Sequence, residues 1–152
     1  MSRSTIPFAP PARLEGDLKR VLVYWDGLKR AENRMPFWDD VAISALPDLA
    51  GRLMLIDVFD KPERFRMNTI GDEITECYGE AVSGVFADEL AHRSPYHFLR
   101  AQCSAAVEAG SPTYYAHTGE PAQTDDRAYA RLLLPMWGNG RVGMLLGGVA
   151  WR

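Results

Sequence analysis

Apolar residues recur along the chain in patterns that predict both helices and strands. From residue 14 to residue 30 they are spaced three and four positions apart, which is typical of an amphipathic helix. The apolar face of this helix is formed by Leu14, Leu18, Val21, Leu22, Trp25 and Leu28. A proline-rich stretch precedes it, so we expect a flexible arm over residues 1–13 and a single domain over residues 14–152.

The middle of the chain changes between strand-like and helix-like segments. Two predicted strands, two short helices and one longer helix cover residues 53–59, 64–70, 74–78, 86–90 and 95–109. Ser94 and Pro95 predict the start of the longer helix, because a capping hydroxyl followed by proline suits the first helical turn. An aromatic and branched segment at residues 113–116 predicts a further strand.

The last two strands are the clearest prediction. Residues 129–137 and 141–151 are apolar, and Asn139-Gly140 between them is a strong hairpin signal. Leu132–Leu134 and Met144–Leu146 are consecutive apolar runs, and neighbouring residues of a strand face opposite sides. Both faces must therefore be covered, one by the central helices and the other by the N-terminal helix or a second copy of the chain. Together these elements predict an α+β fold with a five-stranded antiparallel sheet.

Composition and charge exclude several kinds of function. The 152 residues include 17 Lys and Arg against 20 Asp and Glu, and this net charge of −3 gives no positive field for nucleic acid. Neither a secretory signal nor an apolar run long enough to cross a bilayer is present, so we expect no membrane partner. Cys77 and Cys103 are too few for a disulfide framework or a zinc site, and they predict buried thiols in a reducing cytoplasm.

Several short motifs accompany this order of elements. They are Tyr24-Trp25, Arg34-Met35-Pro36 with Asp39, Ile43–Pro47, Leu55–Val58, Arg64-Phe65-Arg66 with Ile70-Gly71, Gly79 with Ser83-Gly84, and the terminal hairpin. In this order they resemble a PAS domain, and more closely the PAS-like family of small stand-alone proteins of alphaproteobacteria. Two positions depart from that pattern: Asn68 stands where a basic residue is common, and Ala81 where an acidic residue is common.

The resemblance implies a curved antiparallel sheet whose helices close a cavity. It also implies a non-enzymatic sensor or adaptor in signal transduction that associates through its N-terminal helix. For that association we expect a homodimer built on Leu14, Leu18, Val21, Trp25 and Leu28. The chain has no room for an output module, so a separate signalling protein is the expected partner.

Aromatic and sulfur-containing side chains are the candidates to line a small-molecule pocket. These candidates are Phe65, Met67, Tyr78, Phe86, Phe98, Tyr114 and Met144, together with Asp57. Methionine adapts to irregular shapes, which suits a small apolar ligand, but core packing explains the same residues. Asp57 interrupts an apolar strand, so we expect it either to pair with Arg64 or Arg66 or to anchor a ligand.

We predict no cofactor and no metal site. Neither cysteine has the Asn-Cys-Arg setting of a flavin-reactive thiol. Haem-binding relatives use a histidine on the longer helix, but His97 is interpreted as a solvated residue of the first helical turn. His92 and His117 are expected in loops without metal-ligand spacing, and Asp125-Asp126 is expected to be a solvated turn.

Two other classes of function remain open. A small enzyme on an α+β cone, such as a cyclase or isomerase, would need a base, and only Asp57, Glu76 and His97 are candidates. None of them has a recognisable partner, so no catalytic residue is assigned. The other class is a structural interaction protein with a filled core.

Overall fold

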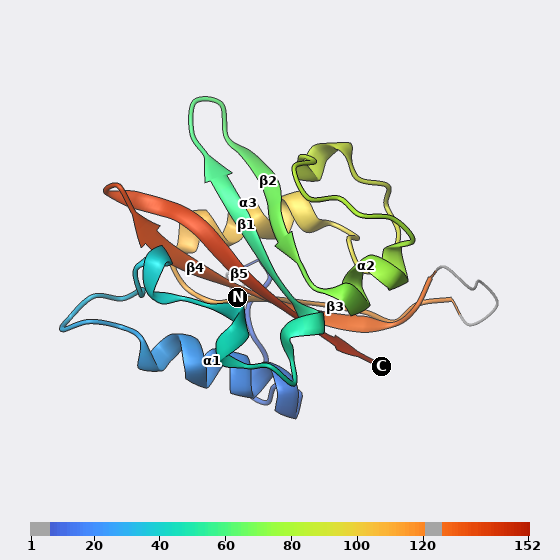
Figure 1. The fold of residues 1–152 in the computed structure, drawn as a ribbon, viewed down its shortest axis with the longest axis horizontal. Coiled ribbons are helices and arrows are strands. Elements are labelled where there is room, and N and C mark those ends of the chain that lie inside the picture. Colours follow the sequence, from blue (N-terminus) through green and yellow to red (C-terminus); the bar gives the residue numbers. More distant parts are fainter. Residues whose placement is uncertain (1–6, 121–125) are drawn as a thin grey trace, which may run out of the picture.

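The computed structural model describes residues 7–120 and 126–152 (Figure 1). Its helices are α1 (Gly16–Gly27), α2 (Asp72–Tyr78) and α3 (Leu99–Ala109), and its short 3-10 helices are η1 (Trp38–Asp40), η2 (Ile43–Ala45), η3 (Ala50–Arg52) and η4 (Ala87–Glu89). Its strands are β1 (Leu53–Phe59), β2 (Arg64–Ile70), β3 (Thr113–His117), β4 (Tyr129–Gly138) and β5 (Arg141–Trp151). None of the described helices is long and apolar enough to span a membrane.

The five strands form one sheet in the order β2-β1-β5-β4-β3, with antiparallel pairing throughout. β4 and β5 make the predicted hairpin, in which Gly138 pairs with Arg141. Asn139 and Gly140 have φ angles of 55° and 78°, as a two-residue hairpin turn of this kind requires. This strand order, with helices between β2 and β3, confirms the predicted α+β fold class with a five-stranded antiparallel sheet.

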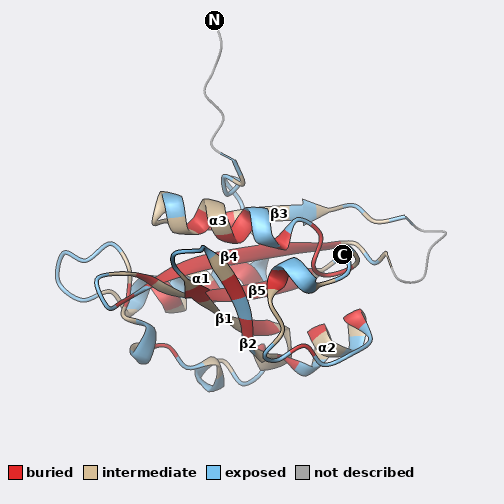
Figure 2. Ribbon diagram, turned by 90° about the horizontal axis from the view of Figure 1, so that it is seen from above, coloured by how far each residue is buried: buried red, intermediate tan, exposed pale blue. Residues whose placement is uncertain are grey.

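One face of the sheet is covered by α2, η4 and α3. The core on this face contains Met54, Ile56 and Val58 from β1, which alternate with residues that point to the other side. Leu133 and Leu145 add the contribution of the hairpin. Figure 2 shows how strongly β4 is buried, and apart from Trp137 each of its residues is buried. We refer to this side as the helical face.

The other face is covered by α1 of the same chain. Leu18, Val21 and Trp25 are almost fully buried against β4 and β5, and the Trp25 indole nitrogen donates to the carbonyl oxygen of Pro135 at 2.9 Å. Leu14 and Leu28 are half-buried beside them. The predicted coverage of both hairpin faces is therefore confirmed. Because these residues are used within the chain, a homodimer, which stays a prediction, would need another surface.

The longer helix begins later than the sequence predicts. α3 starts at Leu99, because Phe98 before it has a φ of 54° and cannot continue a right-handed helix. The Ser94 hydroxyl donates to the carbonyl of Arg127 at 2.6 Å and does not cap the helix. The prediction that Pro95 opens the helix is therefore wrong.

Both edges of the sheet are partly paired. On β2, the Met67 amide donates to the carbonyl of Val85 at 2.8 Å. On β3, the Tyr114 amide donates to the carbonyl of Phe8 at 2.8 Å. Phe8 belongs to the predicted flexible arm, whose residues 1–6 lie outside the described part of the chain.

Candidate functional site

The predicted pocket residues do not surround a common cavity. Phe65, Met67 and Tyr78 are buried in the core of the helical face. Met144 and Tyr114 pack on the opposite face, beside α1. The structure therefore divides these candidates between the two sides of the sheet.

The two remaining aromatic candidates lie outside the core. Phe86 is half-buried, with the Arg64 guanidinium 3.7 Å from its ring centroid. Phe98 is 53% exposed, with the ring of His92 against it at a centroid distance of 4.6 Å. Neither contributes to an enclosed volume with the buried set.

Asp57 is an ion-paired residue of the α1 face. Its carboxylate accepts from the Arg66 guanidinium at 3.0 Å, which confirms one of the two predicted partners. The amide of Asn68 donates to both oxygens of Asp57, at 3.1 and 3.2 Å. Asn68 thus supplies a neutral donor where the resembled family commonly has a second cation.

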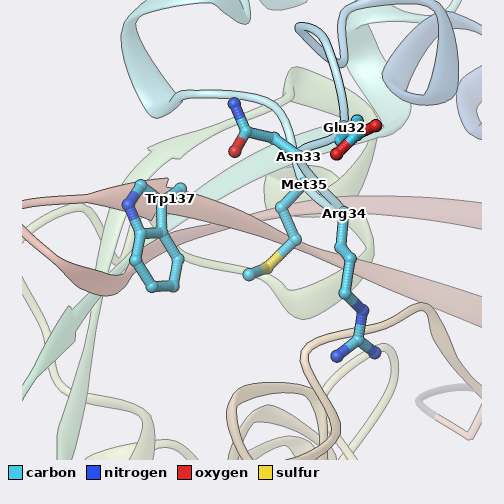
Figure 3. Close-up of a pocket in the computed structure, with 5 residues that line it drawn as sticks. All are labelled: Glu32, Asn33, Arg34, Met35 and Trp137. Carbon is cyan, nitrogen blue, oxygen red and sulfur yellow. The ribbon is translucent and has the colours of Figure 1, made fainter.

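An open cleft of about 370 Å³ lies beside the end of β4 (Figure 3). It is lined by Glu32, Asn33, Arg34, Met35 and Trp137. The segment that carries the first four residues is held to β4 because the Trp137 amide donates to the carbonyl of Pro36 at 2.8 Å. Trp137 and Met35 give the cleft its apolar walls, and we call these five residues the tryptophan cleft.

Trp137 is exposed although it belongs to a strand that is otherwise buried. Its side chain is 37% accessible at the edge of the cleft. Arg34, also exposed, forms no ion pair with any residue that the structure describes. An exposed indole and an arginine that has no ion pair among the described residues thus line one cleft, together with the carboxylate of Glu32, and they could bind an apolar group that carries a negative charge beside it.

A second depression, of about 310 Å³, lies on the other side of the hairpin end. Asp57, Met144 and Trp38 are among the residues that line it. Trp38 is 47% exposed and packs on Gly138, where a Cβ atom would lie 2.5 Å from the Trp38 ring. Glycine is therefore required at position 138 for Trp38 to sit here.

A buried polar network crosses the helical face at α3. Arg131 of β4 is fully buried, and its guanidinium donates to the side-chain oxygen of Gln102 at 2.7 Å. It also donates to the carbonyls of Pro95 and His97 at 2.9 and 2.8 Å. Arg131 therefore fixes the segment that precedes α3 onto the sheet.

That segment places His97 beside His117 and Asp126, which we call the histidine cluster. The His97 and His117 rings stack at a centroid distance of 3.8 Å. Their Nε2 atoms lie 3.3 and 2.6 Å from the same oxygen of Asp126. These three residues offer ligand atoms close enough together to hold a metal ion.

Three sequence-based expectations are wrong at this cluster. His97 is 6% exposed and precedes α3, so it is not a solvated helical residue. His117 is the last residue of β3 rather than part of a loop. Asp126 is partly buried by its contacts with both histidines, whereas the preceding Asp125 lies outside the described residues.

The environment of the cluster determines its protonation. Burial, together with the neighbouring His117 and His92, lowers the pKa of His97 to about 4. The hydrogen bond from His117 lowers the pKa of the Asp126 carboxyl. At neutral pH, His97 is therefore a neutral imidazole beside a carboxylate.

The two cysteines are protonated thiols. Cys103 is fully buried, and burial raises the pKa of its thiol to about 12. Burial also raises the pKa of Cys77, which is only partly covered. Because the thiolate is the reactive form, neither environment is that of an activated nucleophile.

The three candidate bases of an enzyme are not brought together. Asp57 faces α1, whereas His97 lies on the helical face, so the sheet separates them. Glu76 is exposed on α2. A reaction that used one of these bases would therefore need partner residues from outside this set of three.

No family model and no curated protein matches the sequence. Among solved structures, the chain is similar to an RNA-binding light-oxygen-voltage receptor, with 21% sequence identity and a TM-score of 0.42. The match covers 66% of this chain and 29% of that one, so this chain spans less than a third of the receptor's length.

Proposed function

We propose that this PAS-like chain is a non-enzymatic adaptor that binds a segment of a partner protein in the tryptophan cleft. The observation that carries the proposal is the exposed indole of Trp137 at the end of a buried strand. Tryptophan is enriched at the centres of protein interfaces because it offers a large apolar area and one donor.

The two faces and the two edges of the sheet are largely occupied within the described chain, which leaves partner binding to the surface around them. Both faces of the sheet are covered by helices, and both sheet edges are partly paired. The pocket candidates Phe65, Met67 and Tyr78 pack in the core, which favours a partner at the surface over a small molecule enclosed by the helices. Signals would then pass to the partner through contact, as in the sensor or adaptor role that the resemblance implies.

The chemistry of the cleft suggests what the partner segment contains. Trp137 and Met35 would receive an apolar side chain, and Arg34 would pair with a carboxylate next to it. Since Arg34 is exposed, we expect the ion pair to affect the association rate and its salt dependence more than the final affinity.

Site-directed photo-crosslinking tests the proposal. A photoreactive residue at Asn33, on the rim of the cleft, should capture a specific protein in cells. The same residue at Val23, which is 62% exposed on α1, is the matched control and should not capture it. The captured partner is then titrated against purified variants.

We expect Trp137→Ala to weaken binding by roughly 30-fold, or ~2 kcal/mol, as for an interface hot spot. Val23→Ala should leave the affinity unchanged. Equal capture from Asn33 and Val23, or unchanged binding by a folded Trp137→Ala protein, would rule the cleft out. A small molecule retained in native mass spectrometry and lost in Trp137→Ala would instead make this a ligand-sensing cleft.

A further inference from the structure

All three histidines of the chain gather at one place. His92 and His97 lie in the segment between η4 and α3, His117 ends β3, and these are the only histidines among the 152 residues. The ring of His92 lies 5.0 Å from that of His97, and the His97 ring stacks on that of His117. His97 and His117 also share one carboxylate, and this points to a binding site more specifically than the closeness of the rings does.

Each of these two rings is oriented at both of its nitrogens. The Nδ1 atom of His97 lies 3.0 Å from the hydroxyl of Tyr129, and that of His117 lies 3.1 Å from the hydroxyl of Tyr115. Their Nε2 atoms lie 3.3 and 2.6 Å from Asp126 Oδ1. Metal-binding histidines are commonly fixed in this way, with the outer nitrogen hydrogen-bonded so that the inner one faces the ion.

We infer that His97, His117 and Asp126 form a binding site for a divalent transition-metal ion of the Zn²⁺ type. The two Nε2 atoms and Oδ1 would be the ligands, and a fourth position would remain for water or another group. Two imidazoles and one carboxylate suit Zn²⁺ and its neighbours, whereas Ca²⁺ and Mg²⁺ prefer oxygen ligands throughout.

The distances from the two Nε2 atoms to Asp126 Oδ1 are close to what a metal requires, and all three ligand atoms lie within 4.8 Å of one another. Ligands of a tetrahedral zinc ion lie about 3.3 Å apart when each bond is about 2.0 Å long. The distance from His97 Nε2 to Asp126 Oδ1 is already 3.3 Å. The shorter contact of His117, at 2.6 Å, would open by roughly 0.7 Å as the ion replaces the proton between the two groups.

One adjustment of the rings is also needed. Their planes are only 13° apart, so the two Nε2 lone pairs lie in nearly parallel stacked planes, and one ring must turn for both to meet at one ion. A turn of His117 would correct this, because its side chain is 19% exposed whereas that of His97 is 8% exposed. The ion would then join the segment before α3 to the end of β3 and to Asp126.

This site lies apart from the tryptophan cleft, so it does not depend on the proposed adaptor role.

Zinc binding by the metal-free chain, in competition with a coloured chelator, tests the inference. We expect one ion per chain, a higher melting temperature with Zn²⁺, and at least about 100-fold weaker binding in His117→Ala. Asp126→Asn, which keeps the size of the side chain, should weaken binding by at least about 10-fold. His92→Ala is the matched control, because it removes the exposed neighbouring imidazole that is not a ligand.

Circular dichroism shows whether each variant is folded. If His117→Ala does not fold, the zinc affinity of Asp126→Asn tests the site. No zinc bound by the wild-type chain would overturn the site. So would an equal loss of affinity in His92→Ala and His117→Ala, which would indicate adventitious binding by surface imidazoles. Unchanged affinity in a folded Asp126→Asn protein would also overturn it.

Discussion

The guanidinium of Arg131 lies at the centre of the helical face and forms no ion pair with the described residues. Its charge is instead balanced by the Gln102 oxygen, by two backbone carbonyls, and by the rings of Tyr115 and Tyr129 at 5.1 and 6.0 Å. A buried charge is tolerated only when its donors are satisfied in this way. The residue therefore links the sheet to the segment that carries His97.

We expect Arg131→Met to lower the free energy of unfolding by about 2–4 kcal/mol, measured by urea denaturation. The substitution leaves the Gln102 oxygen and the carbonyls of Pro95 and His97 without donors in the core. Arg100→Met, at an exposed position of α3, should change stability by no more than about 0.5 kcal/mol. If Arg131→Met is as stable as the wild type, the free-energy cost of burying the charge equals the stabilisation that these hydrogen bonds provide.

At the scale of elements, α1 is the part whose position the sequence leaves undecided. Its apolar face predicts a partner surface but not whether that surface belongs to the same chain. The structure places Trp25 at 2% exposure against the hairpin, with its indole donating to Pro135. The burial of one large side chain therefore provides a direct test of how the helix packs.

Trp25→Ala should destabilise the chain by about 3–5 kcal/mol, because it removes a large buried ring and leaves a cavity. Trp25→Phe keeps most of the packing and loses the hydrogen bond, so its cost should be about 1 kcal/mol. Val23→Ala on the exposed side of α1 is the control. If Trp25→Ala instead lowers the solution mass and leaves stability unchanged, α1 packs on a second copy and not on its own sheet.

For the whole molecule, the fold could be predicted because apolar residues recur along the chain with the periods of helices and strands. Leu132–Leu134 and Met144–Leu146 require cover on both faces, and the structure supplies it with α1 and α3. The start of α3 could not be predicted, because local preference at Ser94-Pro95 is overridden by the contacts of the Arg131 guanidinium and the Ser94 hydroxyl.

The histidine cluster brings together residues that are far apart in the sequence, but the sequence contained one indication of it. The predicted strands at residues 113–116 and 129–137 are neighbours along the chain, and their antiparallel pairing as β3 and β4 sets His117 opposite Tyr129 and so brings it near Asp126. The position of His97 has no comparable signal, because it depends on a non-helical segment held by Arg131. The exposure of Trp137 likewise follows from the irregular pairing of β4 and β5 between Met136 and Trp137.

The two layers that cover the sheet are held in different ways, and this predicts the order in which the molecule opens. The α3 layer combines a large apolar core with the hydrogen bonds of Arg131, Gln102 and Tyr129. The core contacts of the α1 layer are mostly apolar, with one buried hydrogen bond from Trp25. Since regions with fewer buried contacts open at lower free energy, α1 should open before the sheet does.

Native-state hydrogen exchange measures this order directly. Amides of β4 and β5, which are buried on both faces, should exchange only through global unfolding, whereas those of α1 should exchange at a lower free energy and with little dependence on urea. Amides of α3 are the matched comparison, and they should resemble the sheet. Equal opening free energies in α1, α3 and β4 would mean that the layers unfold as one unit.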